Sequence, residues 1–418
     1  MTIEQTHIDQ IRKQFAELKS KKDLVKLLSD AKNMLYGEKC KPVQLKHLTY
    51  FANPKLCKDR YKTFTVKKKS GGERTINAPV RGLKAILRPL NFVLQCMYEP
   101  HKSATGFVLG RSIVDNGKKH VGHNYVLNMD LKDFFHSFDL YRVKFGLLYH
   151  LWNMKDFSNF KKNHEEEFKQ KEELAFILAS LCTHPFEIDG KIQTVLPQGS
   201  PTSPTLTNIL CRSLDRKLQG VADRFGATYT RYADDITFSS PHNIYKRIEN
   251  PVLNEKGSFT DFISELERII QEEKLAINPA KTRLQKAGYR QEVTGLKVNE
   301  KVNVQRRYVK QIRMWIFYWE KYGYEKAQQL FIRNYIEDKG NVKNVNAHLE
   351  NVLDGKLEYL KMVKGVEDST YLGLWKRFER LTHKPNRETT DNNILIGGNE
   401  LDKILNKLTN NDFDLSLL

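Results

Sequence analysis

The chain is poor in cysteine and has no long apolar run. Its five cysteines are an odd number and none forms a CxxC pair, which argues against a structural zinc site or a disulfide framework. Reduced thiols are typical of the cytosol, so we expect a cytoplasmic protein. No apolar stretch reaches the length of a membrane-spanning helix. The N-terminus is amphipathic and of mixed charge, unlike a signal peptide. We therefore expect no membrane partner.

Acidic residues are outnumbered by basic ones. The 418 residues include 50 Asp and Glu against 69 Lys and Arg, a formal net charge of +19. Such an excess favours a polyanionic partner, whose binding should weaken steeply with salt. A protein can also be basic without such a partner or can bind acidic lipid, but no polybasic segment adjoins an apolar span. The length suffices for two or three subdomains with a substantial shared core.

Two of the acidic residues are adjacent in the sequence. Asp234 and Asp235 lie within the segment Arg231–Ser240, where β-branched and aromatic residues on both sides predict two strands joined by a tight turn. Asp is a common turn residue, so a solvated turn is one interpretation. The other is a magnesium site, because Mg²⁺ takes oxygen ligands and is often held by one or two carboxylates plus substrate phosphates.

A third carboxylate favours the magnesium site. An apolar strand is predicted to end at Asp130, and Asp133 stands where a helix would start. Two-metal phosphoryl transfer uses ions about 3.5–4 Å apart that bridge the attacking and leaving oxygens. Carboxylates from two neighbouring strands can hold such a pair. We therefore expect Asp130, Asp234 and Asp235 to converge.

A loop rich in glycine, proline and hydroxyl groups precedes a predicted helix. In Leu196–Pro204, Gly199 gives a permissive backbone, and Pro201 and Pro204 stiffen the entry to the helix. Such a loop can pack closely under a nucleotide or a template base. An ordinary capped helix start is the alternative interpretation.

The motifs DxxxxF, PQGxxxSP and YADD occur in this order, and together they resemble the palm of reverse transcriptases, more narrowly those of bacterial retrons and defence systems. The resemblance extends from about residue 48 to about residue 381. It implies an α+β right-hand polymerase fold, with an antiparallel palm sheet flanked by helices, fingers, and a helical thumb. The implied parts are an N-terminal helical extension (1–40), interleaved fingers and palm (41–300), the thumb (301–385), and a linker with a C-terminal tail (386–418).

The resemblance also assigns roles to single residues. Asp130, Asp234 and Asp235 match the catalytic carboxylates, which would hold two Mg²⁺ ions. Phe135 matches the gate that excludes a ribose 2′-hydroxyl by its bulk, and Gln198 matches a contact to the sugar of the incoming nucleotide. The residues implied to contact the dNTP are Lys69, Arg74, Phe135, Gln198 and Lys281. A solvated lysine is the alternative for Lys281, which would otherwise neutralise or protonate the pyrophosphate.

Basic segments outside the three motifs are candidates for binding phosphates. Tyr61–Pro79 is predicted to be a basic hairpin, resembling the fingers hairpin that closes over the triphosphate, unless it is merely solvated. An amphipathic helix follows it, and the thumb interleaves basic and aromatic residues that suit a nucleic-acid duplex. The candidate nucleic-acid contacts are Arg81, Lys84 and Arg88 in that helix and Arg306, Arg307, Lys310 and Arg313 in the thumb.

Two further motifs resemble those of retron enzymes. Val293–Asn299 contains the VTG triplet, and Ser112–His120 resembles the NAxxH motif with Gly117 in place of alanine. This departure leaves other defence lineages open. His120 has no second His or Cys at ligand spacing, so we expect it to be structural or to contact RNA.

The predicted function is RNA-directed DNA polymerase activity in bacterial antiphage defence. The expected partners are dNTPs, a cognate structured noncoding RNA as template and in some systems as primer, and the cDNA product. The roughly 33 residues after Pro385 are too few for a ribonuclease H or nuclease domain, so any effector should be a separate protein. Two alternatives remain: a catalytically silent RNA-binding scaffold and a group II intron-like reverse transcriptase. The tail itself is either frayed or a docking peptide.

Overall fold

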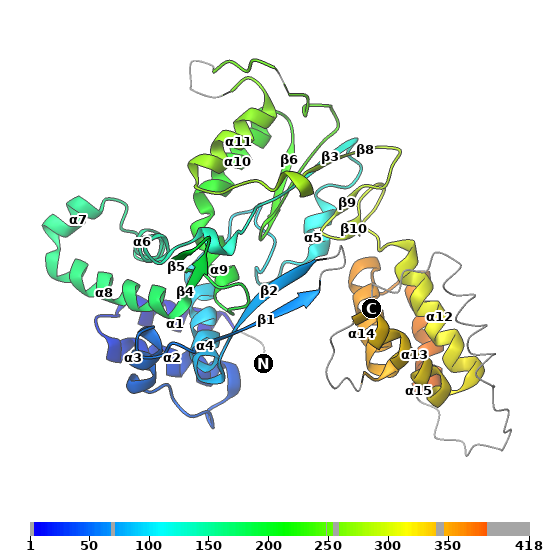
Figure 1. The fold of residues 1–418 in the computed structure, drawn as a ribbon, viewed down its shortest axis with the longest axis horizontal. Coiled ribbons are helices and arrows are strands. Elements are labelled where there is room, and N and C mark those ends of the chain that lie inside the picture. Colours follow the sequence, from blue (N-terminus) through cyan, green and yellow to red (C-terminus); the bar gives the residue numbers. More distant parts are fainter. Residues whose placement is uncertain (1–3, 68–71, 248, 254–258, 340–346, 383–418) are drawn as a thin grey trace. The chain divides into compact units, whose positions relative to one another are not determined.

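The computed structural model describes residues 4–67, 72–247, 249–253, 259–339 and 347–382. It contains two compact units, one made of Met1–Thr65 and Arg74–Thr294 and the other of Val66–Glu73 and Gly295–Leu418 (Figure 1). None of the described helices is long and apolar enough to cross a membrane. The four-part division expected from the sequence stays a prediction.

An antiparallel sheet of four strands, in the order β6-β7-β3-β8, lies at the centre of the first unit. Its strands are β3 (Tyr125–Asp130), β6 (Thr228–Tyr232), β7 (Asp235–Ser240) and β8 (Arg283–Lys286). The β-branched and aromatic residues of β6 and β7 suit a pleated, covered surface, and a short turn joins these strands as the sequence predicted. The strand expected to end at Asp130 is likewise present as β3.

Helices complete the core of this unit. Amphipathic spacing explains their placement: in α11, Asp261 caps the N-terminus and Leu266, Ile269 and Ile270 are buried. The helices are α4 (Arg81–Met97), α5 (Ile113–Lys118), α6 (Leu140–Leu151), α7 (Phe157–Asn163), α8 (Glu165–Cys182), α9 (Ser203–Leu210), α10 (Arg212–Arg224) and α11 (Phe262–Glu272), with 3₁₀ turns η1 (Phe135–Ser137) and η2 (Pro279–Lys281).

Three helices precede the first hairpin. They are α1 (Gln5–Ala16), α2 (Lys21–Tyr36) and α3 (Leu45–Ala52). Ser20 and Asp23 form a capping box at the start of α2, which satisfies backbone N–H groups that the helix cannot pair itself. The apolar residues Leu24, Leu27 and Leu28 recur at helical spacing and are fully buried in the shared core.

Short strands form two hairpins and one further turn. The predicted basic hairpin is present as β1 (Tyr61–Lys67) and β2 (Glu73–Pro79), and β4 (His184–Ile188) pairs with β5 (Lys191–Val195). The short strand β9 (Glu292–Val293) ends at the valine of the VTG triplet, and β10 (Leu296–Lys297) begins directly after its glycine.

The second unit is helical after β10. Its helices are α12 (Arg306–Tyr322), α13 (Tyr324–Lys339), α14 (Leu349–Lys364) and α15 (Ser369–Thr382). Aromatic side chains form much of its interior: Trp315 is buried and meets the ring of Phe331 edge-on at 5.3 Å between centroids. Several of the thumb aromatics noted in the sequence therefore serve packing.

Candidate active site

The sheet brings the three predicted carboxylates to one end. In the register of β3 with β7, Asp130 lies directly opposite Asp235. The Leu131 N–H donates a hydrogen bond of 3.1 Å to the carbonyl of Asp234, which holds the turn against the end of β3. Residues more than 100 positions apart in the chain thus converge because two strands pair.

The converging charges disturb one another. Removal of surrounding water, then the charges of Asp234 and Asp130, raise the pKa of Asp235 to about 6. More than a third of the surface of Asp235 stays exposed, so solvent screening moderates this repulsion. Burial is also the main cause that raises the pKa of Asp234, while Lys281 and Arg74 act in the opposite direction. The site has an excess of negative charge that a cation would relieve.

Lys281 already supplies one positive charge at this site. Its Nζ lies 2.8 Å from both carboxylate oxygens of Asp130, and the Asn278 side chain donates to the same carboxylate at 3.3 Å. The Asn278 N–H donates to the Asp130 carbonyl at 2.8 Å, which fixes the segment against the strand end. The sequence predicted Lys281 near the triphosphate, and in the structure its Nζ contacts the carboxylate of Asp130.

The donor chemistry fits a divalent cation such as Mg²⁺. The three carboxylates offer hard oxygen ligands, and burial, with the neighbouring carboxylates as a further cause, raises the pKa values of Asp234 and Asp235. Among the residues that the structure describes, no group of three or more His, Cys, Asp or Glu side chains is already arranged to hold a metal ion. A cation bound at Asp130 would replace the Nζ of Lys281.

A buried ion pair supports the aspartate turn. Arg231 and Asp215 are both fully buried, and the guanidinium donates two hydrogen bonds of 2.7 Å to the two carboxylate oxygens. Its third nitrogen donates to the carbonyl of Ala233 at 3.1 Å. Ala233 has a left-handed backbone, with φ of 57°, immediately before Asp234. Arg231 therefore holds the strained residue from which the aspartate pair projects.

Sequence reasoning missed this pair, although one signal was present. An arginine inside a strand of β-branched and aromatic residues must find a partner when it is buried. Nothing in the spacing of the chain points to Asp215 as that partner, because it lies on α10 and meets β6 only through tertiary packing.

The NGxxH segment is a buried support of the same hairpin. The two ring nitrogens of His120 lie 2.7 Å from the hydroxyls of Ser239 and Thr230, one on each strand. Burial lowers the pKa of His120 to about 3, so the ring is neutral. Asn116 donates to the hydroxyl of Thr294 at 3.3 Å, which joins the two retron-like motifs. His120 is structural, one of the two roles expected from the sequence.

The predicted nucleotide contacts are distributed over several elements. Gly199 has φ of 123°, and a Cβ there would lie 2.8 Å from the carbonyl of Asn77, so only glycine fits. The Asn77 N–H donates to the Gln198 carbonyl at 2.7 Å, which ties the Gln198 loop to β2. Phe135 is half-buried in the 3₁₀ turn η1 that follows β3.

Other predicted contacts are exposed, and one is outside the described residues. Arg81, Lys84 and Arg88 project from one exposed face of α4, and Arg74 is exposed on β2. Lys69 lies outside the described residues. The expectation that Asp133 starts a helix was wrong: its φ is 46°, and Asp139 caps α6 through a 2.9 Å hydrogen bond from the Arg142 N–H.

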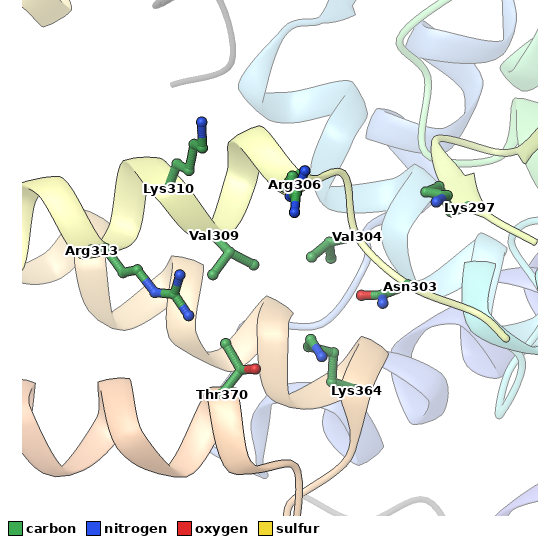
Figure 2. A pocket seen from close by; sticks show the side chains of 9 residues that line it. All are labelled: Lys297, Asn303, Val304, Arg306, Val309, Lys310, Arg313, Lys364 and Thr370. Carbon is green, nitrogen blue, oxygen red and sulfur yellow. The ribbon is translucent and has the colours of Figure 1, made fainter. Parts of the chain in front are cut away.

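A basic pocket of about 770 Å³ lies within the second unit. Figure 2 shows cationic side chains from α12 and neighbouring segments around it. It is lined by Lys297, Asn303, Val304, Arg306, Val309, Lys310, Arg313, Lys364 and Thr370. These residues include no acid and no aromatic ring, so the lining suits phosphate groups better than bases. Three of the four predicted thumb contacts line the pocket, and Arg307 does not.

A sheet with three carboxylates at one end and a separate basic helical unit are the arrangement expected of a nucleic-acid polymerase. A sequence profile described as reverse transcriptase (RNA-dependent DNA polymerase) matches residues 66–310, more than half of the chain. The chain therefore belongs to the reverse transcriptase family. This confirms the predicted α+β right-hand polymerase fold.

Relatives narrow this placement to the retron type. The chain is 35% identical over 316 residues to the retron Mx65 reverse transcriptase of Myxococcus xanthus, covering 72% of this chain and 61% of that protein. It is 33% identical over 260 residues to the retron Ec86 reverse transcriptase of Escherichia coli, covering 61% of this chain and 68% of that protein. The predicted resemblance to bacterial retron enzymes is confirmed. The chain thus spans less than two thirds of the Mx65 relative.

Among solved structures, telomerase from Candida albicans in complex with a fragment of telomeric RNA aligns with a TM-score of 0.40. The alignment has 10% identity and covers 77% of this chain and 63% of that one.

Proposed function

We propose that this protein is an RNA-directed DNA polymerase that copies a cognate structured noncoding RNA into cDNA in a retron or related antiphage defence system. The observation that carries the proposal is the register that sets Asp130 opposite Asp235 on paired strands. Family membership and the names of the relatives support the reaction class. Five cysteines without a disulfide suit a reducing cytoplasm.

The chemistry follows from the residues at the sheet end. Asp130, Asp234 and Asp235 would hold two Mg²⁺ ions, which when bound lower the pKa of a primer hydroxyl and stabilise the departing pyrophosphate. Lys281, displaced from Asp130, is positioned to neutralise phosphate charge. Arg74, whose charge already acts on Asp234, would contact the triphosphate. Phe135 and Gln198 would select and orient the sugar of the dNTP.

The basic surfaces would position the strands. Arg81, Lys84 and Arg88 on α4 would contact the template, and the pocket lined by Arg306, Lys310 and Arg313 would hold phosphates of the duplex. Contacts of this kind are largely independent of base sequence, so recognition of the cognate RNA would depend on its folded shape. An effector protein, where the system has one, would be a separate partner.

Replacement of Asp234 and Asp235 together by alanine tests the proposal. We expect dNTP incorporation on a primed RNA template to fall by more than the roughly 10–100-fold typical of residues that only support metal ligands. RNA binding, measured by filter retention, should persist. Asp59→Asn, at an exposed position, is the matched control. Full synthesis by the double variant would refute the site, and an inactive wild type that binds RNA would favour the scaffold alternative.

A further inference from the structure

Phe107 has a backbone conformation that an aromatic residue rarely adopts. Its φ is 58°, in the left-handed region, and 47% of its surface is exposed. Bulky residues in this region are genuine outliers and persist only where the surrounding structure imposes them. A half-exposed ring does not need such a backbone for core packing. The strain therefore calls for a different explanation.

Hydrogen bonds impose this conformation by fixing the segment before Phe107 to β6. The Arg231 N–H donates to the Ser103 carbonyl and the Thr105 N–H donates to the Arg231 carbonyl, both at 2.8 Å. The buried Asn208 side chain donates to the carbonyl of Gly106 at 2.8 Å. Residues 103–107 therefore lie along the strand that leads into the aspartate turn.

Gly106 brings this segment against the turn itself. A Cβ at this position would lie 2.9 Å from the Ala233 nitrogen and 3.0 Å from the Cα of Tyr232, so no larger residue fits. The ring of Phe107 then lies beside that of Tyr232, with 5.7 Å between centroids and 43° between planes. The two rings form an aromatic ledge, and Tyr232 is only two residues from Asp234.

We propose that this ledge, Phe107 with Tyr232, receives a nucleobase of the primer–template at the catalytic carboxylates. The inference rests on the proposed polymerase function and adds a binding contact to it. Every base has a π-face, so an exposed ring can support any base, which a template-copying site requires. Phe107 would thus be a positioning residue that sets the end of the strand relative to Asp234 and Asp235.

The test replaces Phe107 with glycine and with tyrosine. Glycine removes the ring and relieves the left-handed strain, so Phe107→Gly should fold, with an unchanged or higher melting temperature. We expect its Kd and KM for primer–template to rise about tenfold, within the range of stacking contributions per base. Phe107→Tyr keeps a ring and should restore affinity to within about twofold of the wild type.

Abasic substrates identify which strand uses the ledge. An abasic site at the primer terminus or at the templating position should weaken wild-type binding. In Phe107→Gly, the same abasic site should cause little further loss of affinity if the missing base is the one that contacts Phe107. Asn153→Gly relieves a left-handed residue elsewhere, and Tyr141→Ala removes an aromatic residue that is 62% exposed. Both controls should bind as the wild type does.

The proposal is overturned if Phe107→Gly binds primer–template with wild-type affinity. It is also overturned if this substitution weakens binding equally for the intact substrate and for substrates abasic at the primer terminus or at the templating position. Equilibrium binding is measured without dNTPs, so this outcome is separate from the proposed function. If the wild type incorporates no dNTP, but Phe107→Gly still binds primer–template more weakly than the wild type does, the polymerase activity is contradicted and the ledge is supported.

Discussion

The aspartate turn of the first unit and the basic pocket of the second hold charge in opposite ways. At the turn, Arg231 and Asp215 are fully buried and their hydrogen bonds fix a single geometry. In the pocket, Arg306, Lys310 and Arg313 are exposed and line a cavity of about 770 Å³. The difference suits the two tasks proposed for these regions: catalysis would need carboxylates at defined positions, whereas phosphate binding would need a density of positive charge.

The largest effect expected from this comparison concerns two arginine–carboxylate pairs. Arg231→Gln leaves Asp215 buried without its positively charged partner and with only the Tyr229 hydroxyl as a side-chain donor, which should lower the free energy of unfolding by about 3–5 kcal/mol. Arg377→Gln breaks the pair with Glu320, whose side chains are both about one third exposed, and should cost about 0–1 kcal/mol. Urea denaturation measures both. Equal losses would contradict the contrast between a fully buried and a partly exposed ion pair.

The next effect concerns the salt dependence of nucleic-acid binding. Lys310→Gln and Arg313→Gln should each reduce the slope of log K against log salt by about one, because each would remove one of the proposed phosphate contacts. The loss should be similar for duplexes of unrelated sequence. Lys376→Gln removes the same charge from an exposed position of α15 outside the pocket and should leave the slope unchanged. A base-dependent loss would show that the pocket reads sequence.

The smallest effect concerns pH. The pKa of Asp235 in the fold, about 6, is above the ordinary value, so the folded state favours the protonated form. Its contribution to stability is therefore present below the ordinary carboxyl pKa and is lost as pH rises through 6. Without divalent cations, the melting temperature of the wild type should fall relative to that of Asp235→Asn between pH 4 and pH 7. A constant difference would show that the fold does not raise the pKa of Asp235.

Much of the catalytic end could be predicted because its signals are local. The local order of residue types indicates the sheet and its carboxylates: strand-forming residues flank Asp234 and Asp235, and an apolar run ends in Asp130. The assigned roles stay predictions, since the structure shows only where these side chains lie.

The supporting residues could not be predicted because they depend on tertiary packing. Asp215 and His120 act on the hairpin from other helices or loops, and no spacing along the chain shows which strand they meet. The role of Phe107 could not be predicted either, because it depends on a left-handed backbone angle that the sequence does not reveal. Asp133 was misassigned because an aspartate close to the end of a strand resembles a helix start. The chain instead takes a left-handed backbone at Asp133, forms the 3₁₀ turn η1, and begins α6 only after Asp139.

The position of β3 inside the sheet limits where the length of this protein can change. One six-residue strand sets the place of Asp130, pairs with the strand that carries Asp235, and on its other edge pairs with β8, which follows Lys281. An insertion or deletion of one residue within it would turn its side chains to the opposite face and move all these groups at once. Changes in length that preserve function should therefore fall outside residues 125–130.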